Sequence, residues 1–274
     1  LVPLLAVMAA AGLASWLPAQ ALAAPGPEAP ALAAFSAQAK ILADARLQVS
    51  ERLEFTVPAQ GAVPDLSREF AVPPGDGAAP DSRPGFAMRA ARLDGTALTW
   101  DTEATPRGLR VRPALPSGLA PGPHVLTLDY ALDRQVAFFP AFDECYFDAL
   151  GPDWRFATAR ATVELILPGR AAPLRRTAYT GPTGGPANSQ SGAQPGSSGH
   201  PGRDFTASTP APGVVRFETT RPLAPGDGFT VNVAWPKGLV QDPDRPGQPE
   251  ATPGATAGNQ PEPDVSKQPP LSAE

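Results

Sequence analysis

LQVSERLEFTV, residues 47–57, alternates apolar and polar side chains along almost its whole length. A period of two is typical of a β-strand with one buried face. Glu51 breaks the pattern, because its position places a carboxylate on the apolar face. A buried charge is costly unless it is paired and hydrogen-bonded, so we predict a buried ion pair with Arg68, at the start of the next apolar stretch. The alternative is a β-bulge that turns Glu51 out to water.

Similar alternation returns in three later segments, residues 126–132, 159–167 and 230–235. Asp94-Gly95 lies between two further short segments and predicts a two-residue hairpin turn. No comparable stretch has the period of a helix over three turns. We therefore predict an all-β fold, an antiparallel β-sandwich (immunoglobulin-like or related), with a disordered internal loop and a disordered tail.

Composition divides the chain into segments. Residues 1–24 combine an apolar run with an Ala-x-Ala site, which predicts a signal peptide or, alternatively, an uncleaved membrane anchor. Residues 25–35 are rich in Ala and Pro and predict a spacer before a β-sandwich domain at 36–240. Within that domain, residues 181–204 have no apolar pattern and predict a mobile loop. Residues 241–274 are Pro-rich and acidic, which predicts a disordered linker and a protein that continues beyond it.

The export signal predicts a protein on the extracytoplasmic side of the cell membrane, or a secreted one. The single cysteine, Cys145, excludes an intrachain disulfide. A net charge of −5 disfavours nucleic acid and anionic membranes as electrostatic partners. The sequence has no phosphate-binding glycine loop, no zinc-type cluster and no nucleophile motif, so we expect no cofactor, no metal and no catalytic residue.

The densest polar cluster is FDECYFDALGPDW, residues 142–154. Acids beside aromatic rings are typical of surfaces that bind sugars or protein partners. The candidate binding residues are Asp143, Glu144, Tyr146, Asp148, Asp153 and Trp154. Clustered carboxylates also suit calcium, but the spacing lacks the regular ligands of an EF-hand loop. The structural alternative is a strand, a turn at Gly151-Pro152 and a second strand, with solvated acids and core aromatics.

These features favour a binding or interaction module at the cell envelope over an enzyme, with an envelope protein or a glycan as the partner. One alternative is a glycan hydrolase that uses paired carboxylates, which requires two acids roughly 5–10 Å apart. The other alternative is a structural spacer between membrane and wall. His124, at the start of a strand, and His200, in the low-complexity loop, lie outside any catalytic context.

Several motifs resemble the domain-of-unknown-function family numbered 2207, a set of predicted bacterial membrane proteins. They are VSERLEF at 49–55 followed by Arg68, DECYFD at 143–148 followed by Gly151 and Trp154, and WPKG at 235–238. Cys145 replaces the leucine that is usual there, and Phe147 and Asp148 replace tryptophan and asparagine. The resemblance implies an extracytoplasmic β-domain whose protein is held at the membrane by the signal or anchor segment or by a C-terminal region missing from this chain.

Overall fold

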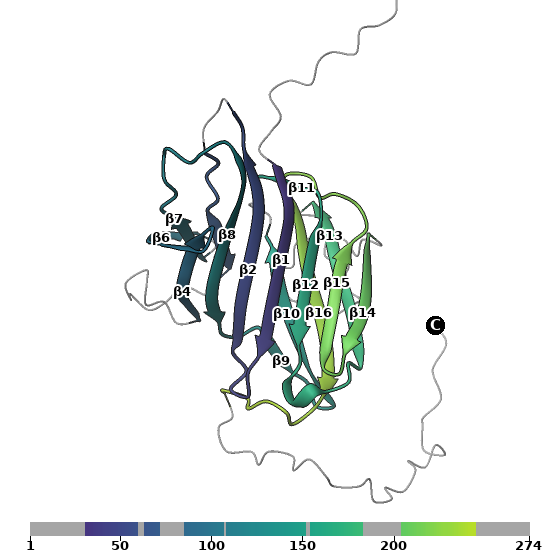
Figure 1. The fold of residues 1–274 in the computed structure, drawn as a ribbon. Helices are drawn as coiled ribbons and strands as arrows, with labels where there is room; N and C mark the ends of the chain where they lie inside the picture. The colour runs from purple at the N-terminus through teal and green to yellow at the C-terminus, as the bar shows by residue number, and fades with distance from the viewer. Residues whose placement is uncertain are drawn as a thin grey trace, which may run out of the picture.

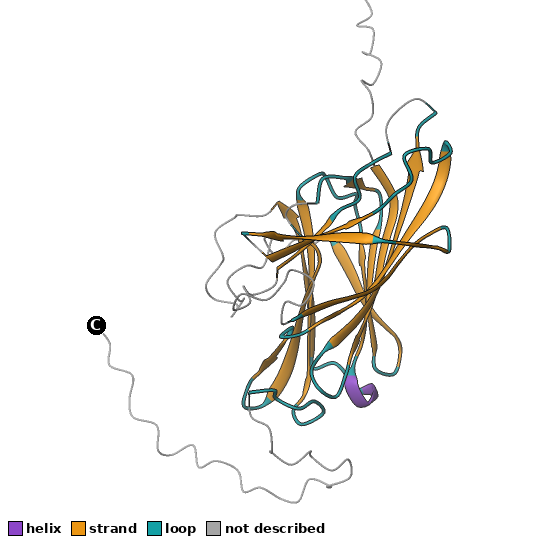
Figure 2. Ribbon diagram, turned by 90° about the vertical axis from the view of Figure 1, so that its left-hand side faces the viewer, coloured by secondary structure: helices purple, strands orange, loops and turns teal. Residues whose placement is uncertain are grey.

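The computed structural model describes residues 31–59, 63–71, 85–106, 108–151, 154–182 and 204–244. In these ranges every regular element is a strand, apart from one short 3₁₀ helix, η2 (Pro168–Arg170). The strands form three sheets, and the two larger sheets pack as the layers of a sandwich (Figures 1 and 2). The all-β, sandwich-like fold predicted from the sequence is therefore confirmed.

The largest sheet has nine strands and forms one layer. Most neighbours pair antiparallel, but β1 pairs with β11 and β12 in parallel. The order along the sheet is β14 (Phe205–Ala211), β15 (Val214–Thr219), β12 (Ala161–Ile166), β1 (Ala31–Ile41), β2 (Leu47–Val57), β8 (Gly122–Leu132), β4 (Phe86–Leu93) and β5 (Thr96–Leu98), with β11 (Ala157–Thr158) also on β1.

Two smaller antiparallel sheets cover the inner face of the large one. The four-stranded sheet has the order β13 (Arg175–Pro182), β16 (Asp227–Pro236), β10 (Phe142–Leu150) and β9 (Val136–Phe138). The three-stranded sheet has the order β3 (Arg68–Ala71), β7 (Gly108–Pro113) and β6 (Trp100–Thr105). Their inner side chains join those of the large sheet in one hydrophobic core.

The alternation read from the sequence places the core as predicted. On β2, Leu47, Val49, Leu53 and Phe55 are buried, while the intervening polar residues are wholly or partly exposed. Asp94 and Gly95 connect β4 to β5 with positive φ angles of 50° and 84°, as a tight hairpin turn requires.

The predicted spacer at residues 25–35 overlaps the first strand and is wrong over that overlap. β1 begins at Ala31 and lies near the middle of the large sheet, between β2 and β12. Leu32 and Phe35 are both about 1% exposed. Alanine is a poor strand former by propensity, but pairing on both edges and burial of one face outweigh that preference.

Some predicted segments lie outside the described residues. They are the signal peptide or anchor at 1–24, positions 25–30 of the spacer, positions 183–203 of the internal loop and positions 245–274 of the tail. The described boundaries differ slightly from the predicted ones, because Gly181 and Pro182 end β13 and the N–H of Gln241 donates to the carbonyl of Ala43 at 2.7 Å.

Candidate functional site

The carboxylate of Glu51 lies inside the core, on β2. Arg68, the first residue of β3, donates from Nε to Glu51 Oε2 at 2.9 Å and from Nη2 to Oε1 at 2.8 Å. The hydroxyl of Tyr130, on β8, donates to the same Oε1 at 2.6 Å. The carboxylate is fully buried and the guanidinium is 3% exposed. The three side chains therefore join three strands from two sheets, and no bulge turns Glu51 outward.

Aromatic rings enclose the guanidinium of Arg68. It lies 5.8 Å from the ring centre of Phe35, 5.4 Å from that of Phe70 and 5.3 Å from that of Trp154, and its Nη2 also donates to the carbonyl of Ala149 at 2.6 Å. Burial alone would lower the pKa of Arg68, but the charge of Glu51 outweighs burial and the pKa is raised. This enclosed cluster is part of the core and offers no surface to a ligand.

Trp154 belongs to that core rather than to a binding surface. It is 3% exposed, and its Nε1 donates to Thr158 Oγ1 at 3.0 Å. Among the other candidates, Asp153 lies outside the described residues. The candidates left to form a surface are therefore those of β10.

Alternation along β10 sends its acids to opposite faces. Asp143 shares the inner face with Cys145 and Phe147, whereas Glu144, Tyr146 and Asp148 share the outer face. The side chain of Asp143 is fully buried and accepts from Lys237 Nζ at 2.8 Å. The structural alternative of solvated acids is therefore wrong for Asp143 and Glu144, which are 0% and 1% exposed.

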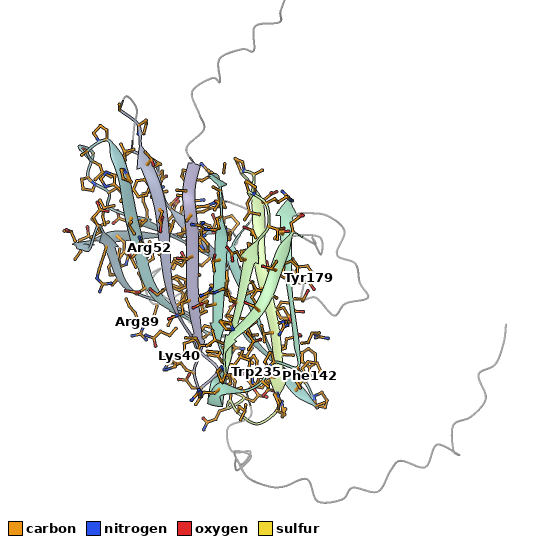
Figure 3. The ribbon with its side chains drawn as sticks, turned by 45° about the vertical axis from the view of Figure 1, so that its right-hand side comes forward. Lys40, Arg52, Arg89, Phe142, Tyr179 and Trp235 are labelled. Carbon is orange, nitrogen blue, oxygen red and sulfur yellow. The ribbon has the colours of Figure 1, made fainter. Side chains whose placement is uncertain are left out.

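The outer face of the four-stranded sheet forms a regular grid of three rows. The register places β16 in the middle, β10 on one side and β13 on the other. We call this grid the outer grid. Its rows are Glu144–Ala234–Arg175, Tyr146–Asn232–Thr177 and Asp148–Thr230–Tyr179. Figure 3 shows Tyr179 toward one end of this sheet and Phe142 at the other end.

Polar contacts join the strands across the outer grid. Arg175 pairs with Glu144 across the small side chain of Ala234, and this hydrogen bond raises the pKa of Arg175. Thr230 Oγ1 donates to Asp148 Oδ1 at 2.8 Å. Tyr146 hydrogen-bonds to Asn232, and burial together with the Glu144 charge raises its pKa, so it stays a neutral phenol.

One polar atom of the grid has no partner within the described part of the chain. Asn232 is 1% exposed, and its Oδ1 accepts no hydrogen bond there. Buried amide oxygens are normally satisfied, so an orphan beneath partly exposed side chains marks a place where a ligand donor gains a bond. Arg175, Asn232 and Tyr179 are absent from the sequence-based candidates. The pattern at 230–235 indicated the face of Asn232, but only strand pairing brings Arg175 and Tyr179 beside it.

The sequence matches the family described as the N-terminal domain of predicted membrane proteins DUF2207, over residues 32–235. The chain belongs to this family. The match covers the strands of the sandwich from β1 to nearly the end of β16. No curated protein matches the sequence.

Solved structures resemble this DUF2207 domain only distantly. Leukotriene A4 hydrolase from Saccharomyces cerevisiae has 10% sequence identity and a TM-score of 0.39, with 74% of this chain and 29% of that chain covered. The M1 zinc metallopeptidase from Deinococcus radiodurans has 15% identity and a TM-score of 0.38, with 75% and 43% covered. The chain thus spans less than half of either protein.

Other features of the DUF2207 domain lie away from the outer grid. Within the described ranges, no three His, Cys, Asp or Glu side chains gather as a metal site would require. The same ranges contain no helix with the length and apolarity needed to cross a membrane. A pocket of about 450 Å³ lies beside the three-stranded sheet, with Asp65, Asp101 and Arg112 in its wall, and no candidate residue lines it.

His124 forms a pH-sensitive contact at the β4–β5 turn. Its Nδ1 lies 2.7 Å from Asp94 Oδ2 and its Nε2 lies 2.7 Å from the carbonyl oxygen of Ala120. Both partners are acceptors, and only the imidazolium donates from both nitrogens. The bond to Asp94 accordingly raises the pKa of His124 and lowers that of Asp94.

We expect the pKa of His124 in the folded chain to lie above 6.5, its value without these partners. The stabilisation is fully present below the unfolded pKa of His124 and is lost as pH rises through the folded pKa. At low pH, the stabilisation that comes from the Asp94 carboxylate is lost as pH falls through the lowered pKa of Asp94. An NMR titration of the His124 ring protons measures the shift, and Asp94→Asn should reduce it. A His124 pKa at or below its unfolded value would contradict this assignment.

Proposed function

We propose that this DUF2207 domain is an extracytoplasmic, non-enzymatic binding module of a membrane-associated envelope protein, and that the outer grid is its contact surface. The observation that carries this proposal is the buried, unpartnered Oδ1 of Asn232 beneath Tyr146 and Thr177, which are half-buried. Three other buried polar atoms of the described residues also lack partners, Asp143 Oδ2, Thr180 Oγ1 and Trp235 Nε1, but strand alternation places them on the inner face, so Asn232 Oδ1 is the one that a ligand on the grid could satisfy.

The chemistry of the outer grid fits a ligand rich in hydroxyl groups. Asn232 offers an unpaired acceptor, the half-exposed Arg175 offers donors, and the partly exposed ring of Tyr146 offers an apolar face. Sugars combine hydroxyl donors with apolar ring faces, so a glycan of the envelope is the partner that we favour. A protein partner with exposed serine or threonine side chains is the second.

The spacing of the acids disfavours the glycan-hydrolase alternative. Glu144 and Asp148 are four residues apart on one strand, so their backbone positions are roughly 13 Å apart. Paired catalytic carboxylates lie within about 10 Å of each other. Asp143 points to the opposite face of the same sheet. The acids of β10 therefore suit the binding of a ligand better than the cleavage of a glycosidic bond.

The positions of the two ends of the described domain support the hypothesis of a structural spacer. β1 starts at one end of the sandwich, while Gln241 contacts Ala43 beyond the other end of β1. A domain entered at one end and left at the other separates what its two ends are attached to. A spacer can also carry a binding surface on its side. The spacer hypothesis and the binding-module hypothesis therefore differ only in whether the outer grid binds a ligand.

The binding test uses chitotetraose and soluble peptidoglycan fragments as probes in isothermal titration calorimetry. We expect Tyr146→Ser to weaken binding by at least about tenfold, because it removes a ring face and a hydrogen-bonding hydroxyl. Gln48→Ala, on the exposed outer face of the large sheet, is the matched control and should leave binding unchanged. If wild-type protein binds neither probe, the glycan proposal is wrong. If wild type and Tyr146→Ser bind equally well, the binding site is not the outer grid.

A further inference from the structure

The hairpin between β9 and β10 carries an apolar tip. Residues 136–142 read VAFFPAF and contain no charge. The N–H of Phe139 donates to the carbonyl of Phe142 at 3.0 Å, and the two ring centres lie 4.7 Å apart with the rings tilted by 31°, so the turn is closed and its rings pack together. Pro140 and Ala141 are exposed, and three phenylalanines, at 138, 139 and 142, are each partly exposed.

Leu174 extends this apolar surface. Its side chain is 60% exposed, which is unusual for a leucine in this structure. Its N–H donates to the carbonyl of Ala234 in β16. The next two positions of β16, 235 and 236, pair with the start of β10. Leu174 and Phe142 therefore lie at the same end of the four-stranded sheet, where Figure 3 places Phe142. We call the surface formed by Phe138, Phe139, Pro140, Ala141, Phe142 and Leu174 the apolar end.

Basic groups border the apolar end, and the acids they pair with are buried. Arg175 lies 5.5 Å from the ring centre of Phe142, and Lys237 lies 5.1 Å from that of Phe138. Their side chains are 56% and 39% exposed, whereas those of the acids they pair with, Glu144 and Asp143, are 2% and 0% exposed. The border thus exposes the cations, whereas the matching carboxylates are buried beneath them.

Exposed phenylalanine and leucine side chains bordered by arginine and lysine are typical of protein surfaces that bind a membrane interface. The rings enter the boundary between headgroups and acyl chains, while the long cationic side chains reach the phosphates. The exposed Arg175 and Lys237 suit this occupant, because lipid phosphates attract cations. The family match to predicted membrane proteins supports it independently.

We propose that the apolar end docks on a lipid surface, with the tip of the β9–β10 hairpin among the headgroups. This surface is separate from the outer grid, and the proposal holds whether or not the grid binds a glycan. The net charge of −5 argues that apolar insertion, rather than long-range attraction, provides most of the binding. Binding should therefore occur on neutral phosphatidylcholine vesicles and change little with added salt.

The test places an environment-sensitive fluorophore at the hairpin tip through Ala141→Cys in the full chain. The native Cys145 is buried, and burial raises the pKa of its thiol, so it should not compete for the label. On adding phosphatidylcholine vesicles, we expect a blue shift of the emission and quenching by spin-labelled lipids. A second label at Ser117→Cys, exposed in the β7–β8 loop at the opposite end, should show neither effect.

The double variant Phe139→Ser with Leu174→Ser tests the apolar contribution. We expect it to reduce the vesicle partition coefficient seen by the Ala141→Cys label at least about tenfold. Gln48→Ser with Thr127→Ser, on the outer face of the large sheet, is the matched control. The proposal is overturned if the label at position 141 stays in water or if the label at position 117 responds instead. It is also overturned if the emission shift appears without vesicles as the protein concentration rises, because that result would indicate contact with a second copy of the chain.

Discussion

Replacing Glu51 by leucine is expected to lower the free energy of unfolding by about 3–5 kcal/mol. The loss arises because the change leaves the guanidinium of Arg68 buried without its carboxylate and leaves the hydroxyl of Tyr130 without its acceptor. A neighbouring solvent-exposed pair, Arg52 and Glu54, supplies the comparison, and Glu54→Gln should change the stability by less than about 1 kcal/mol. Urea denaturation followed by circular dichroism measures both.

Removing both charges should restore much of that stability. In Glu51→Leu with Arg68→Met no buried charge remains, and well-packed apolar residues often replace a buried pair at little net loss. Near-additive losses in the double variant would show that the two residues act independently. A loss below about 1 kcal/mol for Glu51→Leu alone would show that water or a rearranged neighbour satisfies Arg68.

Replacing Gly213 by alanine is expected to lower the free energy of unfolding by roughly 2–5 kcal/mol. Gly213 lies in the β14–β15 turn with φ of +77°, and a Cβ there would lie 2.4 Å from the Cα of Arg170. The contact is with backbone, so no rotation of a side chain relieves it. The alanine therefore has both a strained backbone and a steric clash with η2.

Gly226→Ala separates these two effects. Gly226 has a similar φ of +85°, but a Cβ added there meets nothing within 4 Å. It should therefore show only the backbone strain, about 1–2 kcal/mol. Chemical denaturation of the two variants under the same conditions gives the difference. Equal losses at Gly213 and Gly226 would mean that the η2 segment moves away freely.

The buried ion pair was predictable because two simple patterns agree. The period of β2 fixed the face of Glu51, and an acid on that face requires a cation nearby. Arg68 was the nearest basic residue at the start of an apolar stretch. Tyr130 and the three rings around Arg68 come from strands far apart in sequence, and their approach depends on sheet order, which alternation within one strand does not specify.

The acidic cluster shows how a dense sequence motif divides in three dimensions. Residues that are adjacent on a strand point to opposite faces, so Asp143 and Glu144 have different environments although they are neighbours. Trp154 lies beyond the end of β10 and packs over Arg68. The binding surface proposed above instead combines β10 with β13 and β16, whose pairing is a long-range property of the sheet.

The first strand was missed because composition suggested a linker. Alanine and proline around residues 24–34 resemble a flexible spacer, and propensity offers no contrary signal. The pattern is weak because a register shift between Leu32 and Ala34 breaks the period of two, and because the alanines at 37 and 39 carry little apolar contrast. Tertiary pairing with β2 and β12 determines the outcome at this segment.

The central place of β1 gives the domain a particular response to tension. β1 is bonded to β2 on one edge and to β12 on the other along most of its length. A force that draws the start of β1 away from Gln241, which bonds to Ala43 beyond the other end of β1, acts along the strands and perpendicular to the hydrogen bonds that hold β1. These bonds are then loaded together in shear rather than opened one after another. A domain held at both ends in this way would resist being stretched and would transmit the load to whatever each end is attached to.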